Sequence, residues 1–448
     1  MVSSTQEKMP TRLFHKPLSS IIPTFVWGAR EVKAWDIFGL FVSTCLISQG
    51  LATAAHAANP QHLEQLRTTN SCPKCDLRDA QLTQANLEKA DLSGANLEGA
   101  NMEGANLSNA KLSRVQLSGA QLSGAVLAGA NLREAQLSAR KQDKKTVVTN
   151  LQNANLQGAD LVGANFTGVQ LKGANLRETK LSYAQLSASN LEKADLTRSQ
   201  LGAANLSGAN LKEAQLQTAT LSGANLTGAQ MSGASLQTIS ADSVNLSGAD
   251  LRQANLSEAN LDHAKLKGTK LQDAVLSAAT LRSSDLSGSN LQGAKLKGAD
   301  LGRVNLSGAN LVGADLTNAK LASANLTAAQ LTGAKLPSSY LFSANLSKAN
   351  LNGVDLRQAL LRSADLTNAT LVGATLENAN LISTQLVKAN LNYSNLTQCD
   401  LRGANLTDAN LSNANLSQAD LELATLANAN LTGANLSNAK IQDAIGLK

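Results

Sequence analysis

The sequence predicts a solenoid, a single elongated body in which the chain turns at regular intervals and stacks on itself. A five-residue period runs without a slip from Leu151 to Ile441. This period matches neither the 3.6-residue repeat of a helix nor the two-residue alternation of a long strand. The central position of each repeat is nearly always Leu and never polar. Because such a fold grows by stacking, the length of 448 residues does not imply several domains.

Charge pairing predicts the number of residues in each coil. Between Asn150 and Ile445, we compared the residues that directly precede each central position. Residues one coil apart stack at about 4.8 Å, so opposite charges should be favoured there and like charges avoided. A spacing of twenty gives eight opposite pairs and one like pair, whereas fifteen gives three of each and twenty-five gives none and two. The sequence therefore favours twenty residues per coil. The opposite pairs are Asp160/Lys180, Asp250/Lys270, Lys265/Asp285, Lys295/Asp315, Asp300/Lys320, Asp315/Lys335, Lys335/Asp355 and Asp420/Lys440.

Each repeat offers two side chains to the interior. The central Leu can fill the core, and the small residue two places before it, usually Ala, can share that core. The other three positions face water, and Gly, Asn and Ser two places after Leu suit corners with positive φ. One repeat departs from this pattern, since Ala241 stands where Leu is expected. Ile239 and Val244 are larger than the usual Ala at the flanking inward sites, so we expect the core volume to be roughly conserved.

The repeat Ala-[Asn/Asp]-Leu-x-x resembles the pentapeptide-repeat family, and the resemblance covers Cys75 to Ala444 apart from one interruption. Thirteen central positions lie between Leu77 and Leu137 and fifty-nine between Leu151 and Ile441. The resemblance implies an all-β fold, a right-handed quadrilateral β-solenoid with four pentapeptides in each coil. About eighteen coils would make a rod on the order of 85 Å long. We expect solenoid over residues 75–137 and 151–445, followed by a tail at 446–448.

Residues 1–57 are predicted to be a signal peptide. A basic stretch precedes the apolar run from Ile37 to Ile47, and Ala55-His56-Ala57 matches the small-x-small pattern of signal peptidase sites. We expect cleavage between Ala57 and Ala58, export to the periplasm or the thylakoid lumen, and no membrane attachment afterwards. The alternative is an uncleaved membrane anchor, although the apolar run is shorter than the roughly 20 residues that span a bilayer.

The segment 58–74 is predicted to cap the first coil. Asn59 and Pro60 suit a helix N-cap and first position, and Leu63 and Leu66 lie on one face of a helix over Gln61 to Thr69. Cys72 and Cys75 follow, and in an oxidising compartment we expect a disulfide that fastens the cap to the first coil. A redox-active pair or half of a metal site is the alternative. No βαβ pattern and no second ligand cluster supports either.

The spacing between Leu137 and Leu151 is fourteen, so residues 138–150 form a basic loop outside the period. Long departures from a strict solenoid are common places for binding surfaces. We take Arg140, Lys141, Lys144 and Lys145 as a possible interaction loop. A solvated insertion without a partner is the alternative.

Composition argues against catalysis and nucleic-acid binding. After the predicted cleavage the histidines are His62 in the cap and His263, alone on an outward position, so no triad has a candidate base, and we expect no catalytic residue, cofactor or metal.

The mature chain carries 34 basic and 30 acidic residues. Some family members are implicated in mimicking DNA to inhibit type II topoisomerases, a role that needs a strongly acidic cytoplasmic rod. Near-neutral charge and an export signal disfavour that alternative. A carbohydrate-acting β-solenoid is a more distant one, because the smooth repeat leaves no insertion to build a cleft.

The predicted function is therefore a non-catalytic exported rod that serves as a structural or protein-interaction scaffold. We expect an unknown protein partner and no nucleic acid. Few residues follow the last repeat, so either Ile445 and Leu447 fold back over the last coil or two rods meet in an end-to-end homodimer.

Overall fold

The computed structural model describes residues 57–142 and 144–446. The predicted signal peptide, apart from Ala57, and the side chain of Leu447 lie outside these residues. In the described ranges, no helix has both the length and the apolar character needed to cross a membrane.

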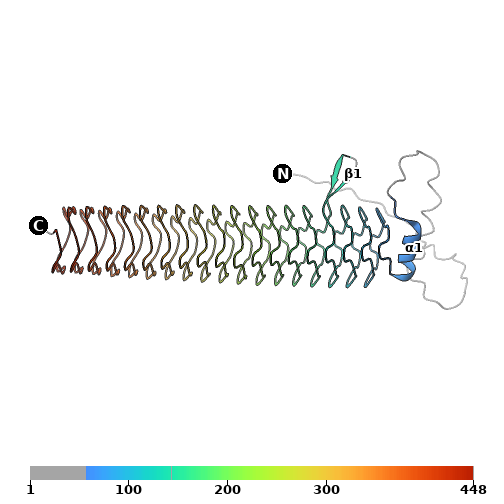
Figure 1. Ribbon diagram of the computed structural model, residues 1–448, viewed down its shortest axis with the longest axis horizontal. Helices are drawn as coiled ribbons and strands as arrows, with labels where there is room; N and C mark the ends of the chain where they lie inside the picture. The colour runs from blue at the N-terminus through green and yellow to red at the C-terminus, as the bar shows by residue number, and fades with distance from the viewer. Residues whose placement is uncertain (1–56, 143, 447–448) are drawn as a thin grey trace, which may run out of the picture. The chain divides into compact units, whose positions relative to one another are not determined.

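The repeats form a rod by pairing each coil with the next (Figure 1). The residue before each central position makes a parallel β-bridge to the residue twenty places further on, as in Asn205 with Asn225. All eight opposite-charge pairs counted in the sequence are bridge partners of this kind. Each bridge is one residue long, so the regular part of the rod contains extended pairing without strands of ordinary length.

Backbone hydrogen bonds explain how five residues make one side of a coil. Leu206 N donates to the Asn225 carbonyl on the next coil at 2.7 Å, and Gly208 N donates to the Thr227 carbonyl at 3.0 Å. Ala209 N closes a turn by donating to the Leu206 carbonyl at 3.0 Å. Gly208 has a φ of 65°, which its missing Cβ tolerates. The same pattern recurs along the rod, so bonds between coils satisfy the backbone.

The interior consists of the central Leu column on each side together with the small residues. The central side chains are almost fully buried from Leu92 to Leu426, and Phe166 occupies one of their positions without exposure. Most polar residues in the small position bind a nearby carbonyl, as when Ser189 Oγ donates to the Leu186 carbonyl at 2.7 Å, whereas the buried Ser199 Oγ has no hydrogen-bond partner within the described part of the chain. The core is therefore sealed against water, as the polar-free central column predicts.

Outward side chains pair differently from the expectation. Of the eight charge pairs that predict the coil length, only Asp420 and Lys440 approach within ion-pair distance in the described residues, at 3.3 Å. Several aspartates instead bind an arginine two residues further along, such as Arg252 with Asp250 and Arg357 with Asp355. The planar guanidinium can bind the carboxylate through two nitrogens, whereas lysine remains a solvated point charge. Opposite charges at these bridge positions thus indicate the register and rarely form an ion pair. Other charged pairs twenty residues apart do form one, as Lys172 does with Glu192 at 2.9 Å.

A helix covers the first coil. Helix α1 spans Pro60–Thr69, and the side chain of its N-cap, Asn59, accepts a hydrogen bond from Gln61 N at 2.9 Å. Leu66 is buried against the core, and Asp76 N on the first coil donates to His62 Nδ1 at 3.0 Å. The helix therefore caps the first coil through packing and hydrogen bonds.

The bridges begin at Ser71, one repeat earlier than the predicted start of the solenoid at Cys75. The boundary was misplaced because Cys72 fills a central position that Leu fills elsewhere, so the Leu pattern does not reveal this repeat.

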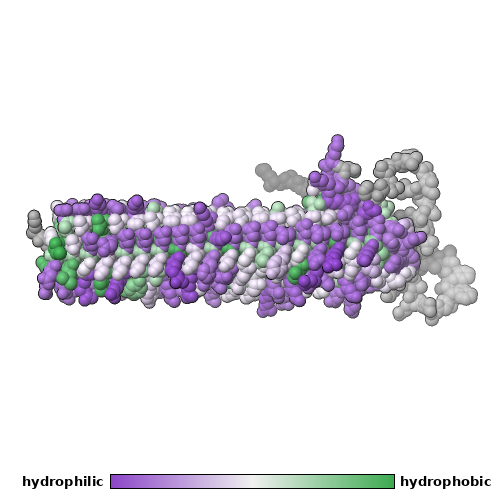
Figure 2. Space-filling model, in the orientation of Figure 1, coloured by the Kyte–Doolittle hydropathy of each residue, from purple (hydrophilic) through white to green (hydrophobic). Residues whose placement is uncertain are grey.

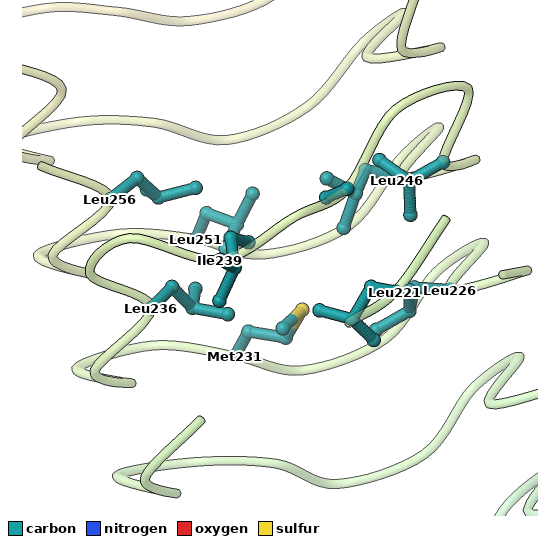
Figure 3. A pocket seen from close by; sticks show the side chains of 10 residues that line it. Leu221, Leu226, Met231, Leu236, Ile239, Leu246, Leu251 and Leu256 are labelled. Atoms are coloured by element: carbon teal, nitrogen blue, oxygen red, sulfur yellow. The ribbon is translucent and has the colours of Figure 1, made fainter. Parts of the chain in front are cut away.

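The repeat at Ala241 leaves an apolar cavity of about 10 Å³. Figure 3 shows side chains from successive coils that converge on it, including Met231, Ile239 and Leu251. All ten lining residues are apolar. Ile239 and Val244 thus replace most of the missing Leu volume and leave a small hole.

Candidate functional site

The interruption of the period is a β-hairpin that projects from the rod (Figure 1). Strand β1 spans Arg140–Gln142 and strand β2 spans Lys145–Val147, and they pair antiparallel. The bridge spacing changes from twenty to twenty-nine across this coil, as in Gln121 with Asn150. Nine residues are therefore inserted, and the rod resumes in register. The run Thr146-Val147-Val148 is typical of a strand and could have indicated the hairpin from sequence.

Thr149 joins the hairpin to the rod. Its side chain is fully buried in a small-residue position, and its hydroxyl accepts a hydrogen bond from Gly119 N at 2.8 Å. Elsewhere the equivalent amide donates to a carbonyl on the next coil, as Gly99 N does to Ser118. The hydroxyl thus takes the place of a backbone acceptor where the chain leaves the rod.

Arg140 fixes the hairpin against the first coils. Its Nη1 lies 2.9 Å from Asp79 Oδ1 and its Nη2 lies 3.3 Å from Asp79 Oδ2. The Arg140 side chain is 9% exposed. It crosses Gly99 and Gly119, and a Cβ added to Gly99 would overlap both Asp79 Oδ1 and Arg140 Nη1. Two coils without side chains at this corner therefore make room for the arginine.

This contact changes the predicted interaction loop. We expected Arg140, Lys141, Lys144 and Lys145 to act together on a partner, but the guanidinium of Arg140 is engaged within the chain. Its partner Asp79 is sixty-one residues away in sequence, so no local pattern could reveal it. Lys141, Lys144 and Lys145 remain exposed on the hairpin. Figure 2 shows the hairpin and the neighbouring coils as strongly hydrophilic.

Cys72 and Cys75 form a disulfide, with their Cα atoms 5.4 Å apart. Both are buried, Cys72 in the central position and Cys75 in the next small position of the first coil. The expectation that the bond fastens the cap to the coil is therefore not met, because neither cysteine belongs to α1. The bond closes one turn of the coil on which the helix rests. At the predicted cleavage site, Ala57 is exposed and Ala58 packs partly against the core.

The described residues contain one histidine–carboxylate contact on the rod surface. His263 Nδ1 lies 3.1 Å from Asp242 Oδ1, so the expectation that His263 stands alone is wrong. Hydrogen bonding to His263 holds the pKa of Asp242 below its ordinary value. Ser243 Oγ donates to the other oxygen of the same carboxylate. The serine therefore contacts the acid and not the imidazole, which is not the arrangement that activates a nucleophile.

Two further groups that could carry chemistry are accounted for. Burial raises the pKa of the Cys399 thiol to about 12, and its Sγ contacts the Leu376 carbonyl in the core. A thiol of this kind is inert at neutral pH. Over residues 57–142 and 144–446, no three histidine, cysteine or acidic side chains are grouped to hold a metal ion.

A comparison with protein-family models matches most of the chain to pentapeptide repeats. The matched residues are 75–139, 149–182, 199–237, 242–336 and 339–443. The gap at 140–148 coincides with the hairpin. A comparison with curated proteins gave no match.

Solved structures of similar proteins come from photosynthetic organisms among others. HetL, a pentapeptide repeat protein involved in heterocyst differentiation regulation in the cyanobacterium Nostoc, is 36% identical, with a TM-score of 0.30. The match covers 47% of this chain and 89% of HetL. A pentapeptide repeat protein from the thylakoid lumen of Arabidopsis thaliana is 31% identical over 25% of this chain and 65% of that one, with a TM-score of 0.18. Rfr23 from the cyanobacterium Cyanothece is 28% identical over 30% of this chain and 88% of its own, with a TM-score of 0.13.

Proposed function

This chain belongs to the pentapeptide-repeat family, and from that premise we propose that it is a non-catalytic exported rod that acts as a scaffold for another protein. The proposal includes right-handed quadrilateral coils, about eighteen in number. The observation that carries it is the contrast between the rod and the hairpin. The coils repeat one regular surface, whereas the hairpin projects from it and presents the exposed lysines Lys141, Lys144 and Lys145 together, with no ion pair to an acidic side chain in the described residues.

The hairpin is suited to contact because it is held in one place. Arg140 binds Asp79 and Thr149 binds Gly119, so both ends of the insertion are attached to the rod. A fixed group of lysines loses little conformational entropy of the backbone on binding. We propose that the partner presents a carboxylate-rich surface to these three lysines.

The hairpin proposal can be tested by affinity capture with two matched variants. Replacing Lys141, Lys144 and Lys145 by Ser should abolish recovery of the partner. Replacing Lys265, Lys267 and Lys270 by Ser removes three exposed lysines from a regular coil and should leave recovery unchanged. Equal losses in both variants would mean that net charge, and not the hairpin, recruits the partner.

Export to the periplasm or the thylakoid lumen is the second part of the proposal. The pattern Ala55-His56-Ala57 supports it, together with a cap and disulfide that begin directly after that site. Fractionation followed by N-terminal sequencing should give a protein that begins at Ala58 outside the cytoplasm. A full-length soluble protein in the cytoplasm would contradict export and would favour reconsidering the cytoplasmic DNA-mimic role.

End-to-end association through the last described coil remains part of the proposal. Ile441 and Ile445 are exposed there, and Ile445 occupies a bridge position opposite Thr425 instead of folding over the core. Ile441→Lys should abolish such an end contact, and light scattering would detect the change in mass. A mass unaffected by this substitution would remove the end contact.

A further inference from the structure

One side of the rod combines aromatic residues with an ordered set of charges. Its bridge column contains, in order, Asp300, Lys320, Tyr340, Leu360, Asn380, Asp400, Asp420 and Lys440. We call the outward residues of this side, from 300–303 to 440–443, the aromatic face. Tyr340 is 42% exposed and Phe342 is 38% exposed, and their ring centroids lie 6.5 Å apart. Tyr340 and Leu360 occupy bridge positions that are polar on most coils.

An apolar group of this kind on a polar rod indicates an interaction surface, and tyrosine and arginine are common where binding energy is concentrated. Arg362 is exposed next to Phe342 along the rod, because Ser343 N donates to the Arg362 carbonyl on the next coil. Tyr183 is more exposed, at 66%, but belongs to a coil without aromatic neighbours. It therefore serves as a matched control for the paired aromatics.

The charges of this face repeat in a self-complementary order. Asp300 is followed one coil later by Lys320. Asp420, six coils after Asp300, is likewise followed one coil later by Lys440. A two-fold axis perpendicular to the rod, midway between the Leu360 and Asn380 coils, relates these pairs. Two antiparallel copies would then place Asp300 opposite Lys440 and Lys320 opposite Asp420 of the second copy. Within each copy Asp300 also binds Arg282 and Asp420 binds Lys440, so the contacts between copies would extend these ion pairs into networks.

A second column obeys the same symmetry independently. Arg303 and Asp443 lie three residues after Asp300 and Lys440, so the same axis places them opposite each other. Both side chains are exposed. The axis also brings Tyr340 opposite Asp400 and Phe342 opposite Arg402 of the second copy. These contacts suit a phenol donor with a carboxylate and a guanidinium with a ring face.

Neighbouring registers lack this complementarity. Moving the axis onto the Leu360 coil places Asp300 opposite Asp420 and Arg362 opposite itself. Moving it onto the Asn380 coil places Lys320 opposite Lys440 and Arg362 opposite Arg402. Like charges directly opposite each other disfavour association. Of these three registers, the one with the axis midway between the two coils has three different opposite-charge pairs and no like-charge pair.

We propose that two copies of this chain bind side by side and antiparallel through the aromatic face, about the axis between the Leu360 and Asn380 coils. The isologous contact uses the same strip twice, as a two-fold dimer requires. The strip is about 34 Å long from the Asp300 coil to the Lys440 coil. A narrow strip of this length makes a small interface, so the dimer is expected to dissociate on dilution.

Sedimentation equilibrium of the purified protein, from about 1 µM to about 1 mM, tests the proposal through a charge reversal and its rescue. Arg303→Asp and Asp443→Arg should each raise the dissociation constant at least about tenfold, and the two together should restore it. Tyr340→Ser with Phe342→Ser should abolish the dimer, whereas Tyr183→Ser should not. Thermal unfolding followed by circular dichroism checks that each variant is folded.

Cysteine cross-linking tests the register itself. Ser323 and Leu423 are exposed, and the axis places each opposite the other in the second copy, whereas two copies of Ser323 would stand about 24 Å apart. A mixture of Ser323→Cys and Leu423→Cys should cross-link on oxidation, and either variant alone should not. A monomer at every concentration would overturn the proposal. A dimer that ignores Arg303→Asp and the aromatic substitutions, or cross-linking by one variant alone, would overturn it as well.

Discussion

The cavity beside Ala241 allows a quantitative test of how the core tolerates an irregular repeat. Ala241→Leu restores the usual central residue, but the cavity of about 10 Å³ has no room for three additional carbon atoms. We expect this substitution to cost about 1–3 kcal/mol through overpacking. Ile239→Ala restores the usual small residue but removes buried carbons, and we expect it to cost about 2–5 kcal/mol.

The two changes should compensate each other when combined. The double variant has the ordinary Ala and Leu of a regular repeat, so its stability should lie within about 1 kcal/mol of the parent. The interaction energy of the cycle should then be at least about 2 kcal/mol in favour of the double variant. Ala314→Ile with Leu316→Ala transfers the irregular pair to a regular, fully buried repeat and serves as the matched cycle. It should show coupling of the same sign.

Hydrogen exchange is the appropriate assay because long repeat proteins need not unfold in a single step. Amides of residues 236–256 report the local free energy of opening around the cavity. Additive effects in the cycle would refute the view that Ile239 occupies the space of the missing Leu.

Three further predictions concern the hairpin, the thiols and acid stability. Gly99→Ala should displace Arg140 from Asp79 and so remove hydrogen-exchange protection from the hairpin, while the coils stay protected. Arg140→Met should have the same effect. Unchanged protection of the hairpin would show that the ion pair does not hold it. Cys399 should resist a thiol reagent at pH 8 until the protein unfolds, because burial raises its pKa to about 12. Labelling of the unfolded chain should count two further thiols, Cys72 and Cys75, only after reduction, and an equal count before and after reduction would contradict the disulfide. Arginine hydrogen bonds lower the pKa of Asp250, Asp355 and Asp400 in the folded state, so their contribution is complete above the unfolded value of about 4 and is lost as pH falls through the lowered folded values. The melting temperature should therefore change little between pH 7 and pH 5 and decrease below about pH 4, and a constant melting temperature there would contradict this assignment.

The regular part of the fold could be predicted because one rule governs it. The central position is nearly always Leu and never polar, so it identifies the inward side chain. Opposite charges at twenty-residue spacing identify the number of residues per coil, as the bridge from Lys295 to Asp315 illustrates. The capping helix could also be predicted, since Asn59 and Pro60 are strong local signals for its start.

Several contacts of the candidate site could not be predicted from the sequence, because they join residues that only the fold brings together. Arg140 has the same local context as the neighbouring lysines, and only the folded rod brings Asp79 within 2.9 Å of it. Likewise, Cys72 fills a Leu position, so the first repeat was assigned to the cap. The contact of His263 with Asp242 crosses from one coil to the next between residues twenty-one apart, which do not occupy bridge positions, so the charge pairing at the bridge positions does not indicate it.

The central claim, an exported rod that binds its partner through a fixed hairpin, is tested most directly by photo-cross-linking in cells. A photoreactive residue would replace Thr146 on the hairpin, with Thr332 on a regular coil as the control position. The account predicts a discrete protein adduct from position 146 alone, carried by a chain that begins at Ala58 in the exported fraction. Equal adducts from both positions, or a full-length chain in the cytoplasm without an adduct, would contradict it.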